Sequence, residues 1–435
     1  MVQLEMQGDF AGAASLAREN AANSSERDQL LWLLEAGRTA QIAGDTSESL
    51  RAFDRAQALV RPYLDTEAEA RITEAIATTL VNQTLSIYHG TPFERIMLAA
   101  LQGMNRLQDG AFDEARVEFN LARDWQDDAA AKAADEIEAA EKEAKDKFDA
   151  KDSLAIPTEL RESLVTLGDR TAYADWQNPF ASWLRAIARI ASAIDDGDLE
   201  DARFDLRAVA TMQPDTASLV APDIQAIESR QFEPTTWVLL MSGLAPELDQ
   251  FRLDIPVPFG SGYFVSAAFP VLKVRDEVAP GLQVEADGTQ SEGVLLANIN
   301  AMSAADYERR LPLIVLQEVM SAAAKTVGTW ALSRNAGDAR GLVQLAGIIA
   351  QATTTAADRR SWRTLPAHIE AARLPTPATG SITVRTREGH LLGTAQVESG
   401  AWNLVVVTVV GNDPTSSAAH AGLQSFTIGP GPTSQ

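Results

Sequence analysis

One spacing of glycines, small residues and large apolar residues occurs three times in the first half of the chain and constrains the fold most. In each copy a small residue lies five positions after a glycine and a large apolar residue lies nine positions after it. The copies are Gly44/Ser49/Phe53, Gly110/Ala115/Phe119 and Gly197/Ala202/Leu206. Glycine permits a left-handed turn, small residues let two helices approach, and the large residue fills the gap between them. The spacing therefore predicts helical hairpins that turn at these glycines.

The openings of two copies also agree. Thr91-Pro92-Phe93 and Asn178-Pro179-Phe180 each place proline eighteen residues before the turn glycine. Thr and Asn are good helix caps, and proline is tolerated at the first helical position. A partial copy surrounds Gly8, but only Met1 to Gln7 precede it, so we expect residues to be missing upstream of Met1.

The repeat and its hairpin form are typical of a tetratricopeptide (TPR)-like solenoid. We predict a TPR-like helical repeat domain over residues 1–232, followed by an α+β domain over 233–411 and a flexible tail over 412–435. The hairpins turn around Gly8, Gly44, Gly110 and Gly197. Further helices are expected over 64–87 and, as a long extension of the second hairpin, over about 113–151.

The second half carries the β-rich segments. We predict strands over about 236–241, 263–269, 293–299, 381–386, 391–397 and 403–409, the last of them buried on both faces. One helix is expected from Ser303 to about 333, with a possible break at Leu311-Pro312, and another over about 338–355. These elements predict a mainly antiparallel sheet with helices on one face.

Charge is distributed unevenly along the 435 residues. The chain has 60 acidic and 37 basic side chains, a net charge of −23, and residues 1–250 hold 45 of the acidic and 23 of the basic ones. A field of this sign repels phosphate backbones and anionic lipid, so nucleic-acid partners are not expected. No apolar run reaches the ~18 residues that a membrane span needs.

Sequence motifs for catalysis and for cofactors are missing. The chain has no cysteine, no phosphate-binding or dinucleotide-binding glycine loop and no nucleophile elbow. The four histidines, His89, His368, His390 and His420, do not stand at metal-ligand spacing, and His368 is expected on a polar helix. We therefore expect no catalytic residues, no metal and no cofactor.

The densest group of functional side chains lies in one short segment. Arginine, tryptophan and aspartate together can bind an anion or a peptide, with a guanidinium stacked on indole. The candidate ligand-binding residues are Asp358, Arg359, Arg360, Trp362 and Arg363. The alternative is structural: Asp358 then pairs with an arginine, and Trp362 anchors the segment in the core.

Several motifs resemble an uncharacterised bacterial family of TPR-like cell-envelope lipoproteins. They are Tyr88 to Arg95, Asn178-Pro179-Phe180-Ala181, Ala202 to Leu206, Gly243-Leu244-Ala245-Pro246, Leu311-Pro312 and Ala357 to Pro366. The resemblance implies export to the periplasm, a lipidated N-terminal cysteine and association with the outer membrane. Genes of the family often neighbour lipoproteins that resemble activators of penicillin-binding proteins. The sequence departs from this pattern because it has no cysteine, and Met241-Ser242 stand where the family carries an acidic residue.

Three functional hypotheses follow. The first is a non-enzymatic scaffold or adaptor of the cell envelope that binds protein partners, among them envelope lipoproteins or cell-wall machinery, through a TPR-like groove. The second is an envelope enzyme or ligand-binding protein that acts on cell-wall glycan or lipid through the Asp358–Trp362 region. The third is a cytoplasmic TPR adaptor, which applies if Met1 is the true start.

Overall fold

The chain forms helices up to residue 229 and mainly strands after it. The computed structural model describes residues 1–65, 87–148, 158, 173, 176–256, 264–275, 279–315, 318, 356–411 and 421–429. The helices are α1 (Val2–Met6), α2 (Phe10–Asn23), α3 (Gln29–Ile42), α4 (Thr46–Leu64), α6 (Pro92–Gln108), α7 (Phe112–Phe148), α9 (Pro179–Ala191), α10 (Asp196–Met212) and α11 (Ala217–Ser229). A further helix covers residues 299–315.

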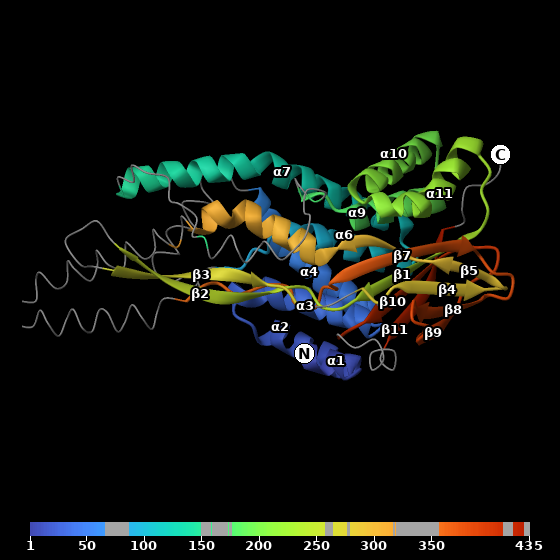
Figure 1. Cartoon of the computed structure of the whole chain (residues 1–435), viewed down its shortest axis with the longest axis horizontal. Helices are drawn as coiled ribbons and strands as arrows, with labels where there is room; N and C mark the ends of the chain where they lie inside the picture. Colours follow the sequence, from blue (N-terminus) through green and yellow to red (C-terminus); the bar gives the residue numbers. More distant parts are fainter. Residues whose placement is uncertain are drawn as a thin grey trace, which may run out of the picture.

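The helices pair in chain order. α3 packs on α4, α6 on α7 and α9 on α10, and each hairpin contacts the next through α4 with α6 and α7 with α9. Gly8, Gly44 and Gly110 have φ of 78°, 80° and 75°, so these turns use the left-handed backbone that the spacing predicts. α7 extends past the other described helices, about as far as the ribbon of β2 (Glu247–Pro256) and β3 (Phe264–Lys273) (Figure 1).

Two glycines set the approach of paired helices. A Cβ on Gly37 would lie 2.2 Å from the ring of Phe53, and a Cβ on Gly103 would lie 2.4 Å from the ring of Phe119. Both rings are buried on the second helix of their hairpin. The same contact therefore recurs in the first two copies of the repeat, where the large residue of the shared spacing fills the gap between the paired helices.

The third copy differs at its turn. Gly197 was predicted as the turn glycine, and this is wrong: it is the second residue of α10, whose cap is Asp195. The helix begins one residue before Gly197, whereas α4 begins two residues after Gly44. Asp195 can cap the helix because its side chain accepts a hydrogen bond from the Asp198 amide, so no left-handed glycine is needed there.

The strands form three sheets. They are β1 (Thr235–Ser242), β2 (Glu247–Pro256), β3 (Phe264–Lys273), β4 (Leu282–Ala286), β5 (Thr289–Glu292), β6 (Val294–Asn298), β7 (His368–Pro375), β8 (Ser381–Thr386), β9 (Leu391–Gln396), β10 (Trp402–Val409) and β11 (Gly422–Gly429). The sheet orders are β11-β10-β1-β7-β6, β5-β4-β8-β9 and the ribbon β2-β3. β1 and β10 run parallel and the other pairs are antiparallel.

The five-stranded sheet is the central layer. Alternate residues of β1 face opposite sides, so Trp237 and Leu239 pack against the helices while Val238 and Leu240 pack against the four-stranded sheet. β10 is buried along its whole length, as predicted. The helix-to-strand change falls at residues 229–235, but one continuous apolar core joins the helices to the sheet.

Several sequence predictions need correction. Residues 422–429 do not belong to a flexible tail, because they pair with β10 as an edge strand. His368 is not on a helix but begins β7. The helix predicted from Ser303 begins earlier, at residue 299, where the Asn298 side chain accepts a hydrogen bond from the Ala301 amide. It also continues through Leu311-Pro312 to residue 315 without a break.

The predicted helices over 338–355 and most of 64–87 lie outside the described residues, as does the second half of the helix predicted from Ser303. The described helix 299–315 packs its buried Tyr307 and Leu311 against the β2–β3 ribbon. The helix lies between α7 and the ribbon (Figure 1) and also contacts the start of α6. No described helix is both long and apolar enough to cross a membrane.

Candidate ligand-binding site

Two charged residues of the predicted segment, Asp358 and Arg360, are engaged in internal contacts. Arg360 forms ion pairs with Asp358 at 2.7 Å and with Asp28 at 3.0 Å, and its guanidinium lies 5.3 Å from the ring centre of Tyr88. These contacts attach the segment to the turn that precedes α3. Arg359 and Arg363 remain exposed, and Arg359 only approaches the similarly exposed Asp249 at 4.0 Å.

Trp362 belongs to the core. Its side chain is 1% exposed, its ring meets Phe53 edge-on with centroids 5.8 Å apart, and its indole nitrogen donates to Thr364. The structure thus brings Asp358, Arg360 and Trp362 together as an anchor, which is the structural alternative stated for this segment.

Two buried carboxylates hold the same segment. Glu94, on α6, accepts hydrogen bonds from the Trp362 amide at 2.7 Å and the Tyr88 hydroxyl at 2.6 Å. Glu35, on α3, accepts from the Arg363 amide at 3.1 Å and the Thr364 hydroxyl at 2.5 Å. Burial raises the pKa of Glu94 and raises that of Glu35 to about 7.

The sequence analysis missed both acids. Thr91 and Glu94 form a capping box, in which Thr91 accepts from the Glu94 amide and Glu94 from the Thr91 amide. That pattern, Thr-x-x-Glu after a loop, could have singled out Glu94. Glu35 follows the apolar residues at the start of α3. This position in the sequence could have indicated that its carboxylate is buried.

The space beside Trp362 is small. A cavity of about 40 Å³ is lined by Glu94, Tyr307 and Ser361, and the Ser361 hydroxyl oxygen is buried without a hydrogen-bond partner. A water molecule needs ~10–15 Å³ of this kind of volume, so the cavity can hold one or a few waters. A glycan or lipid does not fit there.

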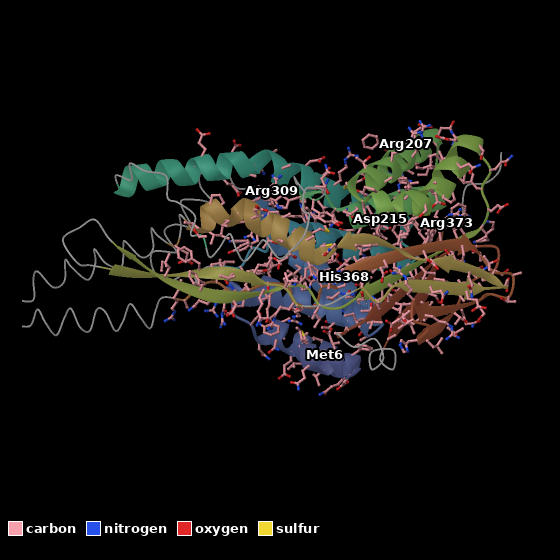
Figure 2. All side chains as sticks on the ribbon, in the orientation of Figure 1. Met6, Arg207, Asp215, Arg309, His368 and Arg373 are labelled. Carbon is pink, nitrogen blue, oxygen red and sulfur yellow. The ribbon has the colours of Figure 1, made fainter. Side chains whose placement is uncertain are left out.

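A larger cavity opens next to it, between the hairpins and helix 299–315. Its volume is about 210 Å³, and its walls come from the end of α4, the start of α6, the middle of α7, Trp176 and helix 299–315. Three aromatic side chains line it: Tyr63, Trp125 and Trp176. Figure 2 shows Arg309, a further wall residue, where helix 299–315 passes close to α7.

Aromatic rings hold two of the guanidinium groups in this cavity. Arg95 lies 4.9 Å from the ring centre of Tyr63, which stacks on His89 with centroids 4.0 Å apart. Arg309 lies 5.0 Å from the ring centre of Trp176. Such contacts fix the planes of the cations and reduce the side-chain freedom that ligand binding would remove.

The remaining cations of the cavity are neutralised. Arg310 pairs with Asp306 at 2.7 Å, and Lys132 pairs with Asp128 at 2.6 Å. Asp306 also accepts the indole N–H of Trp176 at 2.7 Å, which fixes that ring in the wall. Trp176 itself has φ of 56°, a left-handed conformation that is costly for a bulky residue.

Arg95 differs from these cations. Its Nε and Nη2 donate to the carbonyl oxygens of His89 at 3.1 Å and Gly90 at 2.8 Å. No carboxylate of the described residues lies within ion-pair distance of it, and no acceptor there bonds its Nη1. The cavity therefore contains a rigidly held positive charge that no carboxylate of the described part of the chain neutralises.

Metal binding finds no support in the described part of the chain, where no three or more His, Asp or Glu side chains gather at a possible metal site. His368 lies buried at the start of β7 (Figure 2), and burial lowers its pKa.

No protein-family model, no curated protein and no solved structure matches this chain. The site is therefore described from its geometry alone.

Proposed function

We propose that this protein is a non-enzymatic scaffold of the bacterial cell envelope that binds a protein partner through TPR-like hairpins. Consecutive packing of the hairpins supports the TPR-like part of the proposal, as does the Gly/Phe contact shared by the first two. The envelope location, and a partner among envelope lipoproteins or cell-wall machinery, depend on the family resemblance.

The observation that carries the proposal is the composition of the larger cavity. Tryptophan, tyrosine and arginine are the residues that most often dominate the energy of protein–protein interfaces. Here Trp125, Trp176, Tyr63 and Arg95 gather around a space of about 210 Å³. Each is held in place by hydrogen bonds or ring contacts within its own chain or by burial, so a partner would meet an ordered surface.

The proposal is tested by photo-cross-linking from the cavity in living cells. A benzophenone amino acid replaces Ala133, which lines the cavity on α7, and in a matched control it replaces Val117, which is exposed on the same helix. We expect a covalent adduct with one defined envelope protein from position 133 only. The identified protein should bind the purified chain, and Trp125→Ala should weaken that binding at least tenfold.

Two results would contradict the proposal. One is the same set of adducts from positions 133 and 117, which indicates random collisions. The other is an identified protein whose binding to the purified chain is unchanged by Trp125→Ala.

A further inference from the structure

Arg95 gives the larger cavity a preference for one kind of ligand group. We propose that this cavity binds a free carboxylate carried on an aromatic or large apolar residue, and that its natural occupant is the C-terminal residue of the partner polypeptide. The inference rests on the proposed function, because it names the part of the partner that the scaffold recognises.

Charge is the first argument. Arg95, Lys132, Arg309 and Arg310 line the cavity against two acids, Asp128 and Glu136. This excess of positive charge stands in a chain of net charge −23. Asp128 and Asp306 already neutralise Lys132 and Arg310. An entering anion therefore meets Arg95, which has no carboxylate partner among the described residues.

The guanidinium geometry selects a carboxylate. The two carbonyl oxygens of His89 and Gly90 occupy the Nε/Nη2 edge of Arg95. The edge formed by Nη1 and the second N–H of Nη2 has no acceptor among the described residues. Two parallel N–H donors match the two oxygens of a carboxylate. The contact with the Tyr63 ring already orients the Arg95 guanidinium plane.

Size is the third argument. An apolar cavity of ~150 Å³ holds a benzene ring. The cavity here, at about 210 Å³, therefore has room for one ring together with a carboxylate, but not for a nucleotide. The rings of Tyr63, Trp125 and Trp176 provide apolar and aromatic walls for that side chain.

The test measures binding of short peptides to the whole purified chain through tryptophan fluorescence and calorimetry. The probes are an acetylated tetrapeptide that ends in phenylalanine with a free carboxylate, the same peptide with an amidated C-terminus, sodium benzoate and inorganic phosphate. We expect the free acid to bind at least tenfold more tightly than the amide. Benzoate should compete weakly and phosphate should not compete.

Arg95 variants locate the carboxylate. Arg95→Met should abolish the preference for the free acid while leaving the weaker binding of the amide unchanged, and Arg95→Lys should restore only part of it. The matched control is Arg106→Met, on the same helix, which removes an arginine that pairs with Asp54 outside the cavity. It should change neither affinity. Circular dichroism of each variant checks that the chain is folded.

Three results overturn the inference. The free acid and the amide bind with equal affinity, or phosphate competes as strongly as the free-acid peptide. The third is that Arg106→Met lowers the affinity for the free acid as much as Arg95→Met does. If benzoate binds as tightly as the peptide, a small carboxylic acid replaces the polypeptide as the occupant and the partner part is wrong. If cross-linking from position 133 succeeds while neither peptide binds, the carboxylate inference fails and the scaffold function stands.

Discussion

Gly37 and Gly103 each face a phenylalanine ring of the following helix, and this contact sets the distance between paired helices. Neither glycine has a left-handed backbone, so the absence of a Cβ is needed for space and not for a turn. The rings of Phe53 and Phe119 occupy the volume that a methyl group would require. At the residue scale, the packing of the first two hairpins thus depends on two glycine–phenylalanine contacts, Gly37 with Phe53 and Gly103 with Phe119.

Gly103→Ala should therefore destabilise the protein although alanine is the better helix former. Overpacking in a tight core costs ~1–3 kcal/mol, which exceeds the ~1 kcal/mol gained from helix propensity. Urea denaturation monitored by circular dichroism measures the net change, and a second substitution, Phe119→Leu, should recover part of the loss.

The control for this prediction is Gly197→Ala. Gly197 is an exposed helical glycine whose added Cβ would meet only the Asp195 side chain, at 3.1 Å. This change should be neutral or stabilise by a few tenths to ~1 kcal/mol. A loss of stability at Gly197 that equals the loss at Gly103 would show that the Phe119 contact is not the cause.

Helix α6 is fixed at its start by a single carboxylate that serves two elements. Glu94 completes the capping box of α6 with Thr91 and holds the Trp362 amide, 268 positions further along the chain. At the element scale, this side chain joins the second hairpin to the segment that leads into β7. α6 therefore cannot separate from the central sheet without leaving the Trp362 amide unpaired.

Glu94→Gln should destabilise the protein by ~1–3 kcal/mol, because it leaves a buried hydrogen-bond donor without its acceptor. One side of the amide would also present N–H groups to the donors of Tyr88 and Thr91. Thr91→Ala removes the cap alone and should lose ~1 kcal/mol. Hydrogen exchange should accelerate at residues 361–364 in Glu94→Gln only; equal acceleration in both variants argues against the link.

The whole molecule buries charged groups where the first helices meet the central sheet. Glu5 of α1 is 1% exposed, and neither of its carboxylate oxygens has a hydrogen-bond partner among the described residues. Arg38 of α3 is equally buried and donates to the Met241 sulfur of β1 at 3.4 Å. Burial and the nearby Glu35 raise the pKa of Glu5 to about 8, against the weaker opposing effects of Arg38 and the N-terminus.

This arrangement predicts that stability falls as pH rises. The folded-state pKa values of Glu5 and Glu35, about 8 and about 7, lie above the value of 4.5 in the unfolded chain. The folded state therefore holds extra protons between these values. The stabilising contribution is complete below pH 4.5 and is lost as the pH rises to about 8; at ~1.4 kcal/mol per pKa unit, the two shifts together correspond to about 8 kcal/mol.

Glu5→Gln should flatten this dependence and raise stability at pH 8, because it removes the cost of a buried unpaired charge. Denaturation curves at pH 5, 6.5 and 8 measure the slope. Glu19→Gln, an exposed change on α2, is the control and should leave the slope unchanged. A wild-type slope of the opposite sign would mean that Glu5 and Glu35 are charged and stabilising in the folded protein.

Local chemistry was readable from the sequence. A left-handed turn strongly favours glycine whatever surrounds it, so Gly8, Gly44 and Gly110 could be placed from spacing alone. A β-branched run such as residues 403–409 is buried in any sheet, and Thr91-Pro92 caps a helix in any context. The mixed helical and antiparallel β character follows from such local signals.

Contacts between distant segments could not be read in this way. Whether Trp362 meets a ligand or the core depends on Phe53 and Glu94, which lie hundreds of positions away, and residues 422–429 become a strand only because β10 offers an edge. The sequence by itself determined three of the four turn glycines, the caps at Thr91 and Asn178 and six of the eleven described strands, since each depends on neighbouring residues. Only the tertiary structure decided which charges are neutralised, and it left Arg95 facing a cavity because burial and pairing are properties of the packed chain.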